Sequence, residues 1–127
     1  MTPAQRFERL SDLLAADPDL GRRGRWVHAE CRVEIGAEPF HLAIRGGTLE
    51  EFVRGRRLMR SVAFSISGSD EAWQRHWRRI PEPGWHDLFA LTKRGEAAID
   101  GDLRPLLQNL QYFKDLLAMP RRLSEGP

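Results

Sequence analysis

The chain has 127 residues, of which 41% are hydrophobic and 30% are charged, and its formal net charge is +2. This length suits one domain, and this balance of apolar and charged residues is typical of a folded soluble protein and excludes a largely disordered one. No apolar run approaches the ~20 residues that a membrane-spanning helix needs, and the first residues lack the apolar segment of a secretory signal, so we expect a cytoplasmic location.

The N-terminal segment predicts a helix. Thr2 suits an N-cap and Pro3 suits the first helical position, because proline has no amide hydrogen to leave unpaired there. The apolar residues that follow share one helical stripe: Phe7, Leu10, Leu13 and Leu14. Asp17-Pro18 ends this pattern, and residues 19–24 predict a basic connector to the next element, in which Leu20 could belong to a turn of helix.

Residues 27–45 have the two-residue period of β-strands. The apolar positions alternate in both halves of this segment: Val27, Ala29, Cys31, Val33 and Ile35, then Phe40, Leu42 and Ile44. Residues 36–39 interrupt the period, so we expect a hairpin closed by a four-residue turn. This register sets Ile35 opposite Phe40 on a dry face and pairs Glu34 with His41 on a solvent-exposed one.

Two further strands are predicted after the hairpin. Gly46-Gly47 indicates a tight turn before a third strand over residues 48–53. The apolar residues of this strand cannot share one face, which indicates a bulge or an edge position near Glu51. Residues 54–57 predict a turn, and residues 61–67 alternate as a fourth strand.

The second half of the chain predicts three helices and a short strand. Ser69 suits the N-cap of the first helix, whose apolar face holds Ala72, Trp73, His76, Trp77 and Ile80. A short helix begins at Trp85, and residues 96–100 predict a fifth strand. Asp102 suits the cap of the last helix, which Pro120 ends and whose stripe consists of Leu103, Leu106, Leu107, Leu110, Phe113 and Leu117.

Few residues suggest metal or covalent chemistry. Cys31 faces inward, which predicts a buried and inert thiol. The four histidines and one cysteine match no zinc spacing, so we expect neither a metal nor a cofactor. We expect His41 to form a solvent-exposed charge pair with its cross-strand neighbour Glu34. We expect His76 to be a hydrogen-bonded histidine at the core or its rim. No phosphate loop or nucleophile elbow is present, so we expect no enzyme; a small enzyme would need a histidine beside a carboxylate in a concave pocket.

The basic residues are nearly all arginines, since only Lys93 and Lys114 are lysines. The arginines gather in three segments, at residues 22–25, 54–60 and 75–79. Nucleic acid or anionic lipid could bind such clusters. However, the clusters are separate and 18 acidic residues dilute them, so the sequence favours a solvated charged rim and no nucleic-acid partner.

Aromatic side chains recur at helical spacing in the second half of the chain. Trp73 and Trp77 lie one helical turn apart, as do Trp85 and Phe89, and the last helix adds Phe113. We therefore expect an aromatic layer over the dry face of the sheet. Such a layer is either ordinary core, which the periodicity alone favours, or the wall of an apolar ligand cavity.

The order of the predicted elements and two stretches of sequence resemble the sterol-carrier or nonspecific lipid-transfer domain family. The first stretch, residues 65–73, is a strand that runs into an acidic, tryptophan-containing helix start. The second, residues 98–102, is an Ala-Ile-Asp-Gly-Asp turn before the last helix. The similarity spans about residues 7–117. It implies a five-stranded sheet covered on one side by helices, with an apolar tunnel between them for sterols, fatty acyl chains or similar lipids.

The resemblance also implies which side chains line the tunnel. On this chain they are Phe40, Leu42, Phe64, Ile66, Trp73, Trp77, Phe89, Leu106, Leu110 and Phe113. The chain departs from the family's pattern where Trp77, Arg78, Arg79, Trp85 and two prolines add bulk and charge in place of smaller residues around a glycine. These aromatic side chains could fill the tunnel.

The sequence therefore predicts a single α+β domain over residues 1–127, with a core at about 3–119 and a C-terminal tail at 120–127. We expect one mostly antiparallel sheet of about five strands with helices packed on one face. The leading hypothesis is a lipid- or sterol-binding protein that holds an apolar ligand between sheet and helices, near arginines that meet an anionic head, with transient contact at a membrane surface. The alternative is a ligand-free interaction or dimerisation domain of the same fold, including a homodimer.

Overall fold

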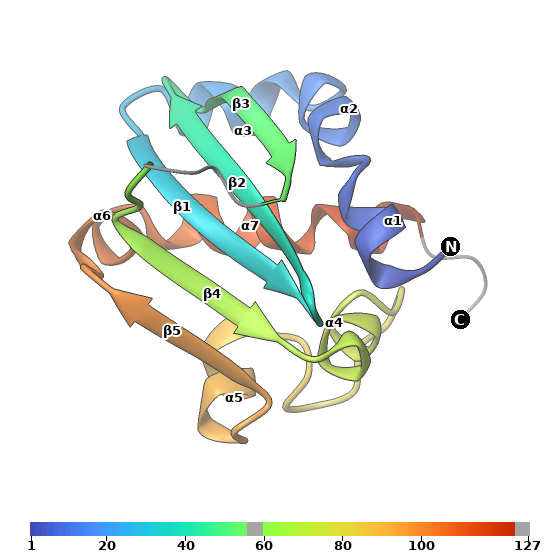
Figure 1. Ribbon diagram of the computed structural model, residues 1–127. Coiled ribbons are helices and arrows are strands. Elements are labelled where there is room, and N and C mark those ends of the chain that lie inside the picture. The colour runs from blue at the N-terminus through green and yellow to red at the C-terminus, as the bar shows by residue number, and fades with distance from the viewer. Residues whose placement is uncertain (56–59, 124–127) are drawn as a thin grey trace.

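The computed structural model describes residues 1–55 and 60–123 (Figure 1). The strands are β1 (His28–Ile35), β2 (Glu38–Arg45), β3 (Thr48–Arg54), β4 (Phe64–Gly68) and β5 (Ala97–Gly101). The helices are α1 (Pro3–Phe7), α2 (Leu10–Ala15), α3 (Pro18–Arg23), α4 (Asp70–His76), α5 (Leu88–Lys93), α6 (Arg104–Gln108), α7 (Leu110–Ala118) and the 3₁₀ helix η1 (Met119–Leu123). Within these ranges, each helix is too short or too polar to cross a bilayer.

The strands form one five-stranded sheet in the order β3-β2-β1-β4-β5. The expected α+β fold with about five strands is confirmed, but the sheet is mixed, because β4 runs parallel to β1 while the other neighbours are antiparallel. β3 is at one edge of the sheet, and β4 pairs with the side of β1 that β2 does not occupy. The connection from β3 to β4 is therefore a crossover past β2 and β1, after which β4 runs in the same direction as β1.

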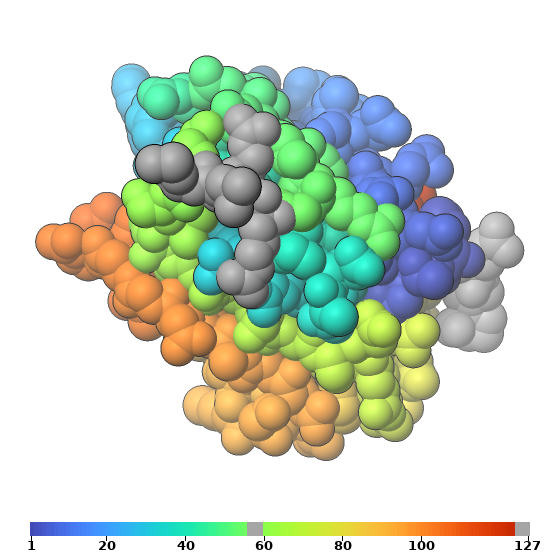
Figure 2. Space-filling model, in the orientation of Figure 1, coloured from blue at the N-terminus to red at the C-terminus, as the bar shows by residue number. Residues whose placement is uncertain are grey.

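The crossover is anchored where its ends are described. The Gly55 amide donates to the Pro39 carbonyl at 2.7 Å, and the Ala63 amide donates to the Glu30 carbonyl at 2.8 Å. Arg56 and Arg57, which complete the turn predicted from the sequence, lie outside the described residues. In the common orientation of Figures 1 and 2, β2 and β3 reach the surface on the face of the sheet toward the viewer, and α7 runs behind the sheet.

The hairpin of β1 and β2 is confirmed, but its turn is shorter than expected. The turn contains only Gly36 and Ala37 instead of four residues, because β2 already begins at Glu38. Gly36 has a φ of +61°, a left-handed conformation that glycine adopts without steric cost, and this allows so short a turn.

The shorter turn shifts the pairing of the two strands by two residues. Phe40 pairs with Val33, and every side chain keeps its predicted face because the period of a strand is two. His41 lies opposite Arg32, so the predicted pairing of His41 with Glu34 is wrong. The outer face of the sheet is also less exposed to solvent at this position than expected, since the His41 side chain is only 3% exposed.

The third strand has both the edge position and the bulge that its irregular pattern of apolar residues indicated. β3 is an edge strand, and its pairing with β2 shifts between Ala43 and Ile44. Ala43 pairs with Glu51 and Ile44 pairs with Leu49, so Glu50 is the extra residue of a bulge.

Two predicted helices end earlier than the sequence indicated. α4 stops at His76, so Ile80 lies beyond it and is 70% exposed instead of facing the core. The last predicted helix is broken at Asn109 into α6 and α7, and Leu107 is 55% exposed. The chain from residue 119 to 123 forms η1, where the sequence indicated the start of a tail, and Arg121 donates two hydrogen bonds to the His76 carbonyl.

His76 is buried in its neutral form, as a core or rim histidine. Its side chain is 2% exposed, and its Nδ1 donates to the Trp85 carbonyl at 2.9 Å. Its Nε2 has no hydrogen-bond partner among the described residues. Burial lowers the pKa of His76 from 6.5 to about 4, because protonation would place a charge in the core.

We expect His76 to make the protein sensitive to acid. The unfolded chain binds a proton near pH 6.5 and the folded chain only near pH 4, so stability is lost as the pH falls through this window. The loss between pH 7 and pH 4.5 amounts to about 2–3 kcal/mol in the free energy of unfolding. Urea titrations of the native chain and His76→Gln at several pH values measure it. Equal pH dependence in both proteins would contradict this account.

Candidate functional site

The ten side chains predicted to line an apolar tunnel all belong to, or pack against, one hydrophobic cluster between the sheet and the helices. Eight of them are buried, and Phe89 and Leu110 are partly buried at its border. The structure therefore brings these residues together as expected. Their role as ligand-binding residues stays a prediction.

The aromatic members of this cluster pack against one another. The ring centroids of Trp73 and Trp77 are 5.1 Å apart, and Phe7 stacks on Trp77 at 5.9 Å with an interplanar angle of 8°. The indole of Trp73 donates to the Glu34 carbonyl at 3.1 Å, and that of Trp77 donates to the Leu117 carbonyl at 2.7 Å. Both indoles are thus fully buried and fixed in orientation, so they occupy the space between sheet and helices.

A mainly apolar pocket of about 510 Å³ lies beside this cluster, between α2, α3 and the turn that joins β2 to β3. We call it the α2–α3 pocket. Its lining consists of Ser11, Leu14, Ala15, Asp17, Pro18, Gly21, Arg22, Arg25, Gly46, Thr48 and Leu49. Its volume lies within the range of small-molecule sites in proteins.

Small residues leave room for this pocket. Gly21 lies in α3, and a side chain built on it would meet only the Gly47 carbonyl oxygen, at the ordinary contact distance of 3.9 Å. Leu14 and Leu49 supply apolar walls from α2 and β3. Asp17 caps α3 by accepting a hydrogen bond from the Leu20 amide at 3.0 Å, which fixes the start of that wall.

The rim of the α2–α3 pocket is basic. The Arg22 guanidinium pairs with Asp19 at 2.5 Å. Arg25 donates to the Arg22 carbonyl at 3.1 Å and has no carboxylate partner in the described part of the chain. The Arg25 guanidinium also lies 5.7 Å from the ring of Trp26, which is 77% exposed. An anionic group at the pocket mouth would therefore meet a guanidinium that no carboxylate among the described residues neutralises, next to an exposed indole.

Sequence reasoning missed this pocket. The sequence indicated a basic connector at residues 19–24 that could include a turn of helix at Leu20. The structure forms the six-residue helix α3 (Pro18–Arg23) there, and this helix is a wall of the pocket. Asp17 followed by Pro18 indicates the end of the preceding helix, but Asp at an N-cap followed by Pro is also typical of a helix start. That signal could have indicated α3. The pocket itself could not be predicted, because it depends on a tertiary contact between α3 and the β2–β3 turn.

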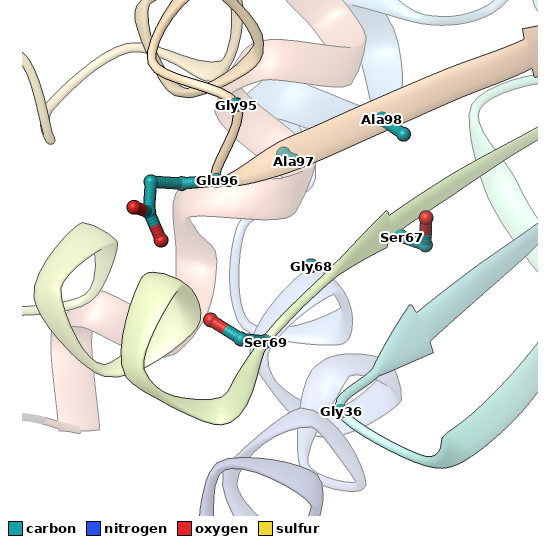
Figure 3. A pocket seen from close by; sticks show the side chains of 8 residues that line it. All are labelled: Gly36, Ser67, Gly68, Ser69, Gly95, Glu96, Ala97 and Ala98. Atoms are coloured by element: carbon teal, nitrogen blue, oxygen red, sulfur yellow. The ribbon is translucent and has the colours of Figure 1, made fainter.

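A second pocket, of about 460 Å³, is shallow and polar (Figure 3). It lies between the hairpin turn at Gly36, the end of β4 and the start of β5, and Glu96 is its only carboxylate. Ser69 is the N-cap of α4, and its hydroxyl oxygen accepts a hydrogen bond from the Ala72 amide at 3.0 Å. No histidine or cysteine belongs to the lining of this pocket.

His41 pairs with the carboxylate of Glu30 on the sheet, and not with the predicted cross-strand neighbour Glu34. The His41 Nε2 and Glu30 Oε2 atoms are 3.1 Å apart. A hydrogen bond from Arg60 at 2.8 Å lowers the pKa of Glu30, which makes this carboxylate a weaker base. Glu30 lines a pocket of about 210 Å³ that contains no serine, threonine or cysteine. This arrangement supports a structural ion-pair network on the outer face.

Cys31 and its surroundings agree with the expected inert thiol. The residue is 1% exposed, and burial raises the pKa of its thiol to about 12. A thiol in this state is neither a nucleophile nor a metal ligand at neutral pH.

A mixed sheet in the order β3-β2-β1-β4-β5, with helices covering one face and an apolar cluster between the layers, is the fold of the sterol carrier proteins. The crystal structure of sterol carrier protein 2 superposes with a TM-score of 0.69 at 13% identity, over 92% of this chain and 94% of that one. A conserved hypothetical protein from Thermus thermophilus, described as possibly a sterol carrier protein, gives 0.66 at 13% identity, over 100% and 92%. The ubiquinone synthesis protein UbiJ, with an SCP2 domain, gives 0.58 at 18% identity, over 97% and 93%.

The resemblance found in the sequence is therefore confirmed at the level of the fold. At these identities the likeness describes the architecture alone. No family model and no curated protein matches the sequence.

Proposed function

We propose that this protein binds an apolar small molecule with an anionic head, such as a fatty acid, in the α2–α3 pocket. The observation that carries the proposal is the pocket itself, which combines apolar walls with the guanidinium of Arg25, a group without a carboxylate partner among the described residues. The sterol-carrier fold of the chain supports the same class of ligand.

Binding would rest on burial of the hydrocarbon chain against Leu14, Leu49 and Pro18. Each Å² of apolar surface removed from water contributes about 25 cal/mol. Arg25 at the rim would hold the head group by charge-assisted hydrogen bonds, which sets the orientation of the ligand. The packed aromatic layer then serves as a rigid wall behind the pocket.

We also propose that the ligand is exchanged at a membrane surface and is not chemically changed. Exposed Trp26 beside Arg25 combines an amphipathic ring with a positive charge, which suits the interface of an anionic membrane. The lowered pKa of Glu30, which makes this carboxylate a weaker base, supports a role as a non-enzymatic carrier. A cytoplasmic location stays a prediction.

Gly21 provides a matched pair of variants for the binding site. We expect Gly21→Leu to fill the α2–α3 pocket and to weaken binding of a fluorescent fatty-acyl probe by at least about tenfold. Gly21→Ala should leave binding close to that of the native chain, since its methyl group meets only the Gly47 carbonyl at 3.9 Å. Probe titration followed by energy transfer from the tryptophans measures both.

Two outcomes would argue against this site. Equal binding by the native chain and Gly21→Leu would place the ligand elsewhere. The absence of saturable binding in the native chain, across fatty acids and sterols, would reject the carrier function altogether. Circular dichroism of both variants controls for folding, and alanine in α3 should raise helix stability by about 0.5–1 kcal/mol.

The second candidate function is a ligand-free interaction or dimerisation domain. The close packing of Trp73, Trp77 and Phe7 favours it, because these side chains occupy the space that a central tunnel would need. A concentration-dependent dimer in analytical ultracentrifugation, together with no ligand uptake, would support this alternative.

A further inference from the structure

A second basic pocket lies on another side of α3. It has a volume of about 510 Å³, and we call it the arginine pocket. Its lining includes four arginines and one acidic residue: Arg23, Arg79, Arg121, Arg122 and Asp115. Arg22, the neighbour of Arg23 in α3, lines the α2–α3 pocket instead, so the two pockets use different side chains.

Distant segments of the chain place these arginines together. Arg23 ends α3, Arg79 follows α4, and Arg121 and Arg122 belong to η1. The position of Arg121 is fixed, because its guanidinium donates to the His76 carbonyl at 3.0 and 2.7 Å. The pocket is thus built by the tertiary fold and does not follow from one basic run of sequence.

The charges in the arginine pocket are not balanced. Arg23 pairs with Asp115 at 3.0 Å, and Arg122 pairs with Asp17 at 2.7 Å. Arg79 has neither an ion pair nor a hydrogen bond with any residue in 1–55 or 60–123. Arg121 binds only carbonyl oxygens within the same ranges. Two positive charges therefore remain beside two neutralised pairs.

We propose that the arginine pocket binds a phosphate group. Guanidinium groups present planar pairs of donors that match two phosphate oxygens, and several arginines around one cavity favour a compact anion with more than one charge. The volume also accommodates a small organic group attached to the phosphate. The phosphate can belong to a lipid head group or to a small soluble molecule, and the site stands independently of the α2–α3 pocket.

Two probes distinguish these sources. Glycerol 3-phosphate carries the phosphate without acyl chains, and dioctanoyl phosphatidic acid carries it on a lipid. We expect saturable shifts of the Arg79 and Arg121 Nε–Hε signals in NMR titrations, and weaker binding as salt is raised. Saturation by both probes assigns the site to phosphate esters in general, and saturation by the lipid alone assigns it to a head group.

Neighbouring arginines give a matched control. Arg79→Gln should weaken probe binding by about tenfold, because it removes an unpaired guanidinium from the pocket. Arg78→Gln removes the same charge from a side chain that pairs with Glu82 at 3.1 Å outside the pocket, and it should change binding by less than about twofold.

Absence of saturable shifts with both probes at millimolar concentration would overturn the proposal, and so would an equal loss in the two variants. Gly21→Leu should leave the titration with glycerol 3-phosphate unchanged, since Gly21 does not line the arginine pocket. A failure of the fatty-acid site and a failure of the phosphate site are therefore distinguishable.

Discussion

Trp77→Ala is expected to lower the free energy of unfolding by about 3–5 kcal/mol. The indole of Trp77 is fully buried, stacks on Phe7 at 5.9 Å and packs against Trp73 at 5.1 Å. The substitution also removes the donor to the Leu117 carbonyl, which lies 2.7 Å from the indole nitrogen. Denaturant titration at neutral pH measures the loss.

Trp77→Phe is the matched control for this substitution. It keeps most of the buried ring but leaves the Leu117 carbonyl without its donor, so we expect a smaller loss of about 1–3 kcal/mol. A cost for Trp77→Ala of less than about 1 kcal/mol would show that the layer is loosely packed around a cavity. That result would favour the central tunnel and argue against a solid wall behind the α2–α3 pocket.

Gly47→Ala is expected to destabilise the protein by about 3 kcal/mol or more. Gly47 has a φ of +79°, and a Cβ there would lie 2.3 Å from the Gly21 carbonyl oxygen and 2.7 Å from the Gly24 carbonyl carbon. These neighbours are backbone atoms of α3 and its cap, so they cannot rotate away. The buried Tyr112 hydroxyl, which donates to the Gly47 carbonyl at 2.9 Å, would be displaced with the turn.

Gly46→Ala separates the steric clash from the backbone strain. Gly46 has a similar φ of +60°, but its Cβ would meet only the Arg25 carbonyl oxygen at 3.7 Å. We expect it to cost about 1–2 kcal/mol, from the left-handed conformation alone. Thermal unfolding of both variants compares them, and equal midpoints would contradict the close contact between α3 and the β2–β3 turn.

The faces of the hairpin could be predicted from the sequence, but its register could not. Alternation of apolar residues fixes which side of a strand is buried, and Val33 and Phe40 are both fully buried as expected. The length of the turn depends on whether Gly36 adopts a left-handed conformation, and a shift of two residues preserves the alternation. The parallel pairing of β4 with β1 likewise depends on the crossover, which no local pattern records.

Part of the aromatic layer was predictable, whereas the pockets were not. Trp85, which the sequence assigns to the layer, lies in a separate small cluster, and Phe7 of α1 stacks on Trp77 instead. The helical spacing of Trp73 and Trp77 places both on one face, and the structure confirms their burial. The α2–α3 pocket depends on three segments that meet only in the folded chain, with Gly21 leaving space among them. The arginine pocket has the same origin, since Arg79 and Arg121 are 42 positions apart in the sequence.

The most direct test of the carrier function is the position of a bound ligand. We would record intermolecular nuclear Overhauser effects between palmitate and the protein with labelled methyl groups. The account predicts contacts from the acyl chain to the methyl groups of Leu14 and Leu49, which line the α2–α3 pocket. Contacts confined to Leu42 and Ile66 in the central cluster would contradict it and would identify the aromatic layer as the ligand site.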